Sequence, residues 1–434
     1  MSHFFVGDKS MRPNKKSFIN PNYPMSNHDM KRDKTWGGTA PRLRPGLWYP
    51  KRFLPRVLPD RPGYVGTTKV DDEIGRVDKI EASKATGSPG GFRFDPPEYR
   101  FLTGDWNARV TKIGETASSH DPHPLHRVMK SLYPGDGLKK HMAKAGEGQV
   151  YPEKTDVDPQ VFSRAVKQFA YDFGAEAVGI TKLNRNWVYQ MEGKDPLPEV
   201  YTHVIIVAVR HPQWRISHSP SYTSDTGSWF AYHHVSLITV EIADWIREMG
   251  YEAKANSCLV GYDIMMPPHE IQAGMGEQCR IGVNLHPVLG PAYKVGAVLT
   301  SLPSVTDKPI KFHLESFCEK CEKCARECPP NAIPSGREQK LKTRGVTKWQ
   351  VDAYKCQSYW TLQNRYNFPN AHDACARCIY VCPWTKYNAE EWPHRLVVAM
   401  VSNFPWLQKI AIKGDDMAGY GKPSKTDPSW EKWF

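Results

Sequence analysis

The cysteines are the residues of this sequence whose type and spacing point most directly to chemistry. Eight of the ten cysteines lie between residues 318 and 382, and only Cys258 and Cys279 lie elsewhere. Disulfides are dense in small extracellular domains, whereas thiols gathered at short regular gaps in a long chain are typical of metal ligands. We therefore interpret the gathered cysteines as a metal centre and expect Cys258 and Cys279 to be ordinary buried cysteines.

The gathered cysteines form two groups that end in the same way. The first, in FCEKCEKCARECPPNAI (317–333), has the spacing C-x2-C-x2-C-x3-C-P. The second, in CARCIYVCPWTK (375–386), has C-x2-C-x3-C-P with Cys356 placed upstream. This run is the pattern of bacterial ferredoxins, in which the fourth cysteine of a group binds the other 4Fe–4S cluster. Two structural zinc sites would also use eight thiolates, but their knuckles are usually paired C-x2-C motifs. The pattern favours iron and sulfur.

The exchange of the fourth cysteine predicts which thiols share a cluster. Each loop then contributes to both clusters, so the two clusters must lie close together and can pass electrons one at a time. Cluster one is predicted to use Cys318, Cys321, Cys324 and Cys382, and cluster two to use Cys328, Cys356, Cys375 and Cys378.

The rest of the sequence lacks the common cofactor motifs. No G-x-G-x-x-G follows a candidate strand and there is no P-loop, so nucleotide binding gains no support. The segment HEIQ (269–272) is not the zinc motif H-E-x-x-H, and the pair His233–His234 is interpreted as ordinary helix histidines. The motif D-x-H-x-x-G, by which many corrinoid proteins bind cobalt, is also absent.

Composition indicates a folded chain with a basic surface. The 434 residues are 40% hydrophobic and 24% charged, and the formal net charge is +12. Such a charge suits nucleic acid or an anionic membrane, but no dense Lys/Arg block with interleaved aromatics chooses between them. No apolar run reaches 18 residues, and the first residues resemble no export signal. We expect a cytoplasmic protein or a mature form whose signal has been removed.

Hydrophobic periodicity predicts an α/β (α+β layered) core between two irregular ends. Strands are expected at 175–183, 201–209 and 295–302, and the continuous apolar run VIIVAV suggests a sheet covered on both faces. A first helix is expected over 158–174 with Asp158 as N-cap, and a second over 229–249. The predicted divisions are an irregular wrapping segment 1–155, the core 156–314, a ferredoxin-like domain 315–390 and a tail 391–434 that packs on the core.

Segments spread over residues 200–425 resemble a known family when they are taken in order. That family is the corrinoid- and iron–sulfur-dependent reductive dehalogenases of organohalide-respiring bacteria. Besides the cysteine motifs, the segments are AYHHVSLITVEIADWIREMGYEA (231–253), IQAGMGEQCR (271–280), LGPAYKVGAVLTSLPSVTDKPIKF (289–312), CQSYW (356–360) and GDDMAGYG (414–421).

The resemblance implies an activity and site residues. Its members remove halogen from small organohalides with Co(I) in a base-off, cobalamin-type corrinoid that has no protein ligand to cobalt. By position, Tyr232 is implied as proton donor and Lys294 as its basic partner. Ser228 and Trp360 are implied as pocket residues. The many aromatics suggest a small apolar pocket for a chlorinated alkane or alkene of one or two carbons, and a haloaromatic stays open.

The resemblance also implies a cellular setting. Members are exported folded by the twin-arginine route and lie on the outer face of the cytoplasmic membrane. They are held there by a small integral-membrane anchor protein and take electrons from a membrane respiratory chain. No nucleic-acid partner is expected, and the oligomeric state is left open.

Two other functions compete with this interpretation. An enzyme similar to epoxyqueuosine reductase would share the corrinoid and the clusters but act on tRNA, which the basic charge suits. A ferredoxin-like electron-transfer subunit would carry clusters without cobalt. Metal content distinguishes the electron-transfer subunit, which lacks cobalt, from the two enzymes. Binding of tRNA distinguishes the epoxyqueuosine reductase-like enzyme from a dehalogenase.

Overall fold

The structure is a computed structural model that describes most of the chain from residue 146 to residue 418. The predicted wrapping segment therefore lies almost wholly outside the described residues, as do Trp360 and the end of the tail. The described residues are 56–57, 64–65, 68–69, 146–189, 195–220, 222–336, 340–343, 346–352, 355–356, 359, 375–386 and 394–418.

A four-stranded sheet forms the centre of the core, with the strand order β4-β5-β9-β6. The three strands predicted from the sequence are confirmed as β4, β5 and β9, and the short strand β6 joins them. Every neighbouring pair in this sheet is antiparallel, so the alternation of strands and helices produces layers without parallel crossovers. The bounds are β4 Ala177–Lys182, β5 His203–Arg210, β6 Ala253–Asn256 and β9 Tyr293–Thr300.

Helix α8, Pro159–Asp172, has the ends that its sequence predicts. The Asp158 carboxylate accepts hydrogen bonds from the backbone N–H groups of Gln160 and Val161, which have no partner inside the helix. Past the last turn, Gly174 has φ +95°, a left-handed conformation that glycine adopts without a steric penalty. The predicted first helix is thereby confirmed.

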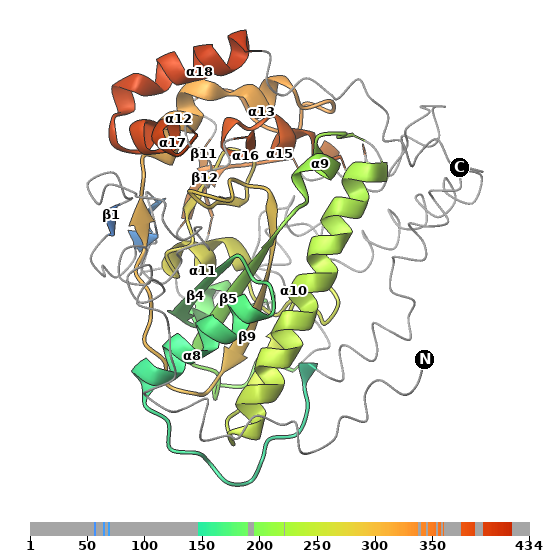
Figure 1. The fold of residues 1–434 in the computed structure, drawn as a ribbon, viewed down its shortest axis with the longest axis vertical. Coiled ribbons are helices and arrows are strands. Elements are labelled where there is room, and N and C mark those ends of the chain that lie inside the picture. The colour runs from blue at the N-terminus through green and yellow to red at the C-terminus, as the bar shows by residue number, and fades with distance from the viewer. Residues whose placement is uncertain are drawn as a thin grey trace, which may run out of the picture.

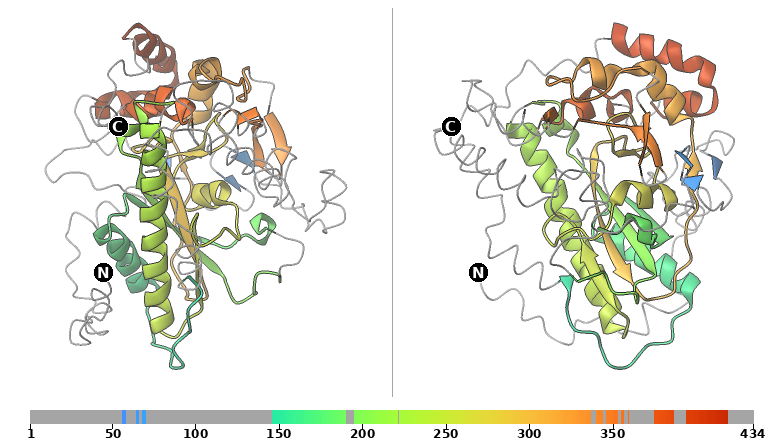
Figure 2. Two further views of the ribbon diagram at one scale, coloured as in Figure 1. Left: turned by 90° about the vertical axis from the view of Figure 1, so that its right-hand side faces the viewer. Right: turned by 180° about the vertical axis from the view of Figure 1, so that it is seen from behind.

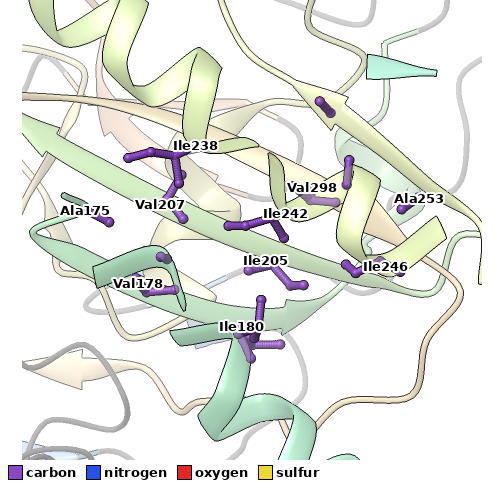
Figure 3. Close-up of a cluster of buried hydrophobic side chains, with 14 of the residues drawn as sticks. Ala175, Val178, Ile180, Ile205, Val207, Ile238, Ile242, Ile246, Ala253 and Val298 are labelled. Carbon is purple, nitrogen blue, oxygen red and sulfur yellow. The ribbon is translucent and has the colours of Figure 1, made fainter. Parts of the chain in front are cut away.

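Helix α10, Tyr222–Glu248, is the longest element and lies along one face of the sheet (Figure 1). Its side chains Ile238, Ile242 and Ile246 repeat at helical spacing and pack onto Ile205 and Val298 of the sheet (Figure 3). Burial of apolar side chains in such a layer is the main stabilising term of a fold. The helix begins several residues before the predicted start at 229, so the phenol-bearing Tyr232 lies in its interior.

The opposite face of the sheet is covered by helix α11, Met266–Gln272, and the segments around it. Alternate residues of β5 pack to the two sides, with Ile205 and Val207 toward α10 and Val204 and Ile206 toward Ile264 and its neighbours. All side chains from residue 204 to residue 209 are buried. The predicted sheet with both faces covered is therefore present.

The cysteine-rich part lies at one end of this layered core, and the tail helices lie over it (Figures 1 and 2). It contains short helices and a two-stranded hairpin, while helices α17 and α18 belong to the tail. On α18 the residues Gln408, Ile412 and Asp415 face inward, and Gln408 accepts a hydrogen bond from Ser316 of the cysteine-rich part. The bounds are α12 Leu314–Cys321, α13 Lys323–Arg326, β11 Lys340–Thr343, β12 Val346–Trp349, α15 Arg377–Val381, α16 Pro383–Lys386, α17 His394–Asn403, η5 Pro405–Leu407 and α18 Gln408–Met417.

The remaining elements are short connections between these parts. They comprise η3 Arg185–Trp187, α9 Gln213–Ile216, β7 Glu277–Gln278, β8 Asn284–Leu285, β10 Ile310–Lys311, and the pieces β1 Arg56–Val57, β2 Tyr64–Val65 and β3 Thr68–Lys69. Strand β1 pairs with β10. Within the described residues, no helix has both the length and the apolar composition needed to cross a bilayer.

Candidate active site and metal centre

Tyr232 and Lys294, which are far apart in sequence, contact each other in the structure. Lys294 lies near the start of β9, and its Nζ atom is 4.3 Å from the centroid of the Tyr232 ring on α10. A cation at this distance is attracted to the face of an aromatic ring. The structure therefore brings together the two residues for which the resemblance implies proton donation and charge support.

A close approach of α10 to β9 explains how the two side chains meet. A Cβ atom added to Gly296 would lie 2.8 Å from Cγ2 of Thr239, so only glycine permits this crossing. Tyr232 lies two helical turns before Thr239 on the same helix face, and Lys294 lies two residues before Gly296 on the same strand face. Helix α10 and strand β9 run in the same direction past the crossing (Figure 1). The residues that precede the crossing on the two elements, Tyr232 and Lys294, therefore meet.

Ser228 lies one helical turn before Tyr232, which places its side chain on the same face of α10. Only 6% of Ser228 is exposed, and its role in the pocket stays a prediction. The other predicted pocket residue, Trp360, is outside the described residues. Its position relative to the tyrosine stays a prediction.

His211 is a candidate site residue that the sequence interpretation missed. It follows β5 directly, its backbone N–H donates to the Ala292 carbonyl beside the start of β9, and it is fully buried. Burial, and then the positive charge of Lys294, lower its pKa well below the usual range, so the imidazole is neutral. The signal for it was a basic polar pair, Arg210–His211, at the end of an otherwise apolar strand.

A second set of buried ionisable groups lies on the opposite face of β9. The Tyr293 hydroxyl donates to Oε2 of Glu270 at 2.9 Å. Burial raises the pKa of Glu270 to about 7, while the hydrogen bond from Tyr293 acts in the opposite direction. Tyr262 donates to the Val295 carbonyl at the edge of β9 that β6 leaves unpaired, and burial raises its pKa. These groups were also absent from the sequence interpretation.

Buried polar atoms without partners test whether this region suits a corrinoid. Among the described residues, both ring nitrogens of His211 and the hydroxyl of Ser257, which lie beside β9, have no hydrogen-bond partner although they are buried, and the same holds for the hydroxyl of Ser219 between α9 and α10. Native proteins seldom leave such atoms unsatisfied. A corrinoid carries a rim of amide groups that both donate and accept hydrogen bonds, so these side chains fit it. Ser257 lies 3.2 Å from the Cβ position of Gly296, at the same crossing.

The first cysteines gather at the junction between the core and the cysteine-rich part. Cys318, Cys321 and Cys382 belong to one apolar cluster together with Phe317 and Trp384. Burial raises the pKa of the Cys318 thiol to about 12, and iron would have to displace the proton. Cys382 comes from the second sequence group, so the chain brings it to the first group as crosswise ligation requires.

The electrostatic neighbours of the remaining cysteines come from both sequence groups. Burial first, and then the thiols of Cys318 and Cys382, raise the pKa of Cys324. For Cys378, burial acts first and the thiols of Cys356 and Cys375 follow, with Cys328 next. Cys324 also has Cys378 as an electrostatic neighbour and packs in one cluster with Cys328, Cys356 and Cys378, so the assignment of the thiols to the two iron–sulfur clusters stays a prediction. Helices α12, α13 and α15, which carry four of the eight motif cysteines, lie together in Figure 1.

The two cysteines outside the motifs differ from each other. Cys279 is buried and its thiol donates to the Val283 carbonyl at 3.2 Å, as expected for an ordinary buried cysteine. The expectation is wrong for Cys258, which is only half-buried, because it lies in the turn that follows β6.

The loops of the core and the cysteine-rich part are in direct contact beside this site. A Cβ atom on Gly290, which precedes β9 and has φ +64°, would lie 2.6 Å from the Trp384 carbonyl oxygen. The Glu277 carboxylate accepts hydrogen bonds from the backbone N–H groups of Phe312 and Leu314, at the start of α12. These contacts hold the cysteine motifs at the end of the sheet where Lys294 and Tyr232 meet.

Comparisons with known proteins agree with this arrangement. Residues 317–385 match the model of a 4Fe–4S double cluster binding domain. A tetrachloroethene reductive dehalogenase of Sulfurospirillum multivorans is 30% identical over 318 residues, which are 64% of this chain and 60% of that protein. A solved reductive dehalogenase, whose structure was described as suggesting a mechanism for B12-dependent dehalogenation, aligns with a TM-score of 0.68 and 26% identity over 85% of this chain.

The fold and the motifs define a layered α+β core joined to a double 4Fe–4S domain. The comparisons confirm the resemblance of this arrangement to the corrinoid- and iron–sulfur-dependent reductive dehalogenases. The chain spans 60% of the length of the Sulfurospirillum relative and 49% of the solved protein. An epoxyqueuosine reductase of Aliivibrio fischeri is 28% identical over a shorter stretch, 34% of this chain and 36% of that protein.

Proposed function

We propose that this chain catalyses reductive dehalogenation, in which an organohalide R–X takes up two electrons and one proton and yields R–H and a halide ion. The observation that carries the proposal is the contact between Lys294 and the Tyr232 ring at the end of the sheet that meets the cysteine motifs. The proposed proton donor and the proposed electron supply therefore lie at the same end of the sheet. The matches to reductive dehalogenases support the same reaction.

Tyr232 is proposed to donate the proton from its Oη atom to the carbon that loses the halogen. A phenol is a weak acid near neutral pH, so the phenolate that remains must be stabilised. The ammonium group of Lys294 beside the ring supplies the opposite charge. Both side chains are half-buried, so water screens this attraction only in part.

His211, Ser219 and Ser257 are proposed to bind the amide rim of a base-off corrinoid through the polar atoms that lack protein partners among the described residues. When bound, that group supplies a low-valent cobalt that reduces the carbon–halogen bond. A neutral His211 can donate with one ring nitrogen and accept with the other. The neighbouring Lys294 disfavours a second positive charge there.

The eight motif cysteines are proposed to hold the two 4Fe–4S clusters in the crosswise sets given above. When bound, the clusters supply the two electrons singly. The chain's own contribution is to bury the thiols and to hold the two motifs against each other, since Cys318 and Cys382 pack against the same apolar cluster. Glu277 fixes the backbone that leads into the first motif.

The substrate is proposed to be a chlorinated alkane or alkene of one or two carbons. The names of the relatives support a chloroethene, since the Sulfurospirillum protein acts on tetrachloroethene. Chloride release from tetrachloroethene, trichloroethane and chloroform, measured anaerobically with a low-potential donor, tests the proposal. Release from a haloaromatic alone would overturn the substrate class, and release from none of these compounds would overturn the activity.

Replacing Tyr232 by Phe is expected to lower the dehalogenation rate by at least about a hundredfold, because the donor proton is lost. Cobalt and iron content should stay unchanged. The matched control is Tyr251→Phe, which removes another helix-proximal hydroxyl, one that donates to the Thr155 carbonyl away from the site. Full activity in the Tyr232 variant would show that the proton comes from another group.

A tRNA-modifying activity is the second candidate, supported by the net charge of +12 and by the likeness to epoxyqueuosine reductase. Tight binding of a tRNA stem loop with a steep salt dependence would favour it.

The resemblance further supports a peripheral location on the outer face of the cytoplasmic membrane after twin-arginine export, with a small membrane anchor. Fractionation of intact cells with external protease tests that location, and a protein that stays protected in the cytoplasm would contradict it.

A further inference from the structure

Arg280 is a buried arginine whose hydrogen-bonding groups all point into the loops around the cysteine motifs. Its side chain is 1% exposed. The guanidinium donates from Nε and Nη2 to the Cys318 carbonyl, at 3.2 and 3.0 Å. It also donates from Nη1 to the carbonyls of Pro334 and Gly336, at 2.8 and 3.0 Å. One side chain of the core therefore joins the start of the first motif to the loop that follows its last cysteine.

The charge of Arg280 is only partly balanced by its neighbours. Nη2 lies 3.3 Å from Oε1 of Glu322, a residue between the second and third cysteines that is 29% exposed. The same carboxylate accepts a hydrogen bond from the Gly336 N–H. The guanidinium also stacks over the Trp349 ring, 4.7 Å from its centroid. The buried member of the pair is thus the cation, and the anion is the member nearer to water.

We propose that Arg280 is a positioning residue that raises the reduction potential of the adjacent cluster, the one that Cys318 ligates. The inference rests on the proposed assignment of clusters to the cysteines. Reduction adds one negative charge to a 4Fe–4S cluster, and hydrogen bonds and nearby charge are among the factors that set its potential. A buried cation next to a ligand stabilises the reduced form, because little water screens it. The adjacent cluster is thereby easier to reduce.

The test is an anaerobic redox titration of the iron-loaded full chain, followed by electron paramagnetic resonance. In Arg280→Gln, one of the two clusters is expected to be harder to reduce. At a fixed potential its ratio of reduced to oxidised form should fall about tenfold, which corresponds to a reduction potential ~59 mV more negative. Arg280→Lys keeps the charge and should restore part of the shift. If Arg280 only held the loops in place, the cluster that Cys318 ligates would keep its potential in Arg280→Gln wherever that cluster still assembles.

Glu322→Gln is the complementary variant, because it removes the anion and keeps an oxygen that can accept from Gly336 and Arg280. It should shift the same potential in the positive direction, and it decides the matter if Arg280→Gln does not assemble. The matched control is Arg326→Gln in the same motif, where a 53% exposed arginine pairs with Asp416 and water screens the charge. Arg326→Gln should therefore shift the reduction potential less than Arg280→Gln does.

Equal potentials in Arg280→Gln and the unaltered protein would overturn the inference, as would shifts of the same sign in Arg280→Gln and Glu322→Gln. Failure of the unaltered chain to bind iron is a different result, since it would contradict the proposed function itself. Iron content measured on every sample before titration separates the two failures.

Discussion

At the scale of single residues, the proposed reaction depends on one weak acid and one cation, both half-buried, that contact each other. The Tyr232 phenol can release its proton only if the resulting anion is stabilised, and Lys294 lies 4.3 Å from the ring centroid. The sequence could supply both residues through the resemblance alone. Neither His211 nor Glu270 could be found that way, because a single polar residue at a strand end or on a short helix has no motif around it.

Lys294→Gln is expected to reduce the dehalogenation rate by roughly tenfold to a hundredfold, because each ~1.4 kcal/mol lost in stabilising the phenolate costs about a factor of ten. Lys294→Arg keeps the positive charge and should retain more activity than the glutamine variant. Steady-state halide release by the two variants, compared at equal cobalt and iron content, checks this order. If the glutamine variant were the faster one, charge support by Lys294 would be disproved.

Glu270 predicts a pH dependence of stability. Burial raises its pKa from 4.5 to about 7, so the folded protein holds a proton that the unfolded chain releases between these values. The free energy of unfolding should therefore fall as pH rises through this window, by on the order of 3 kcal/mol for this group, and stay low above it. Glu277, whose pKa burial also raises to about 7, contributes in the same direction.

Glu270→Gln should remove the contribution of Glu270 to the pH dependence of the free energy of unfolding. The contribution of Glu277 should remain. The measurement is the unfolding midpoint of the variant and of the unaltered protein at about pH 5 and about pH 8, in matched buffers. The midpoint of the variant should change less between the two pH values. Equal changes in both proteins would mean that the buried carboxyl does not carry a raised pKa.

At the scale of elements, the decisive contact is the crossing of α10 over β9. Helix periodicity and capping residues predicted α8 and most of α10, and the apolar runs predicted β4, β5 and β9. The sequence could not predict that every strand pairs in the antiparallel sense, because pairing depends on contacts between distant segments. The role of Gly296 was equally hidden, since a glycine in a strand pattern has several structural causes.

Gly296→Ala tests this crossing. The added methyl would lie 2.8 Å from Cγ2 of Thr239, and relief of that overlap should cost about 1–3 kcal/mol of stability and shift Tyr232 relative to Lys294. Chemical denaturation should show the loss, and dehalogenation should slow with it. The matched control is Gly414→Ala on α18, where nothing lies within 4 Å and alanine should stabilise by ~0.5–1 kcal/mol.

If Gly296→Ala proved as stable and as active as the unaltered protein, the close crossing would not be what aligns the tyrosine and the lysine. A stabilised Gly414→Ala beside a destabilised Gly296→Ala would separate the local contact from the general effect of the substitution on the backbone.

At the scale of the whole molecule, two parts with different tasks meet at one end of a sheet. Cysteine spacing predicted the double-cluster part, because short gaps and the terminal proline are a local signature. How the parts join was not predictable, because Glu277, Arg280 and Gly290 act through backbone groups distant in sequence. The wrapping segment and Trp360 lie outside the described residues, and their predicted roles stay predictions.

The most direct test of the account is the metal content of the full chain after anaerobic reconstitution with iron, sulfide and a corrinoid. After removal of unbound reagents, elemental analysis should give about one cobalt and about eight irons per chain. Bound iron with no retained cobalt would contradict the proposed reaction and leave an electron carrier.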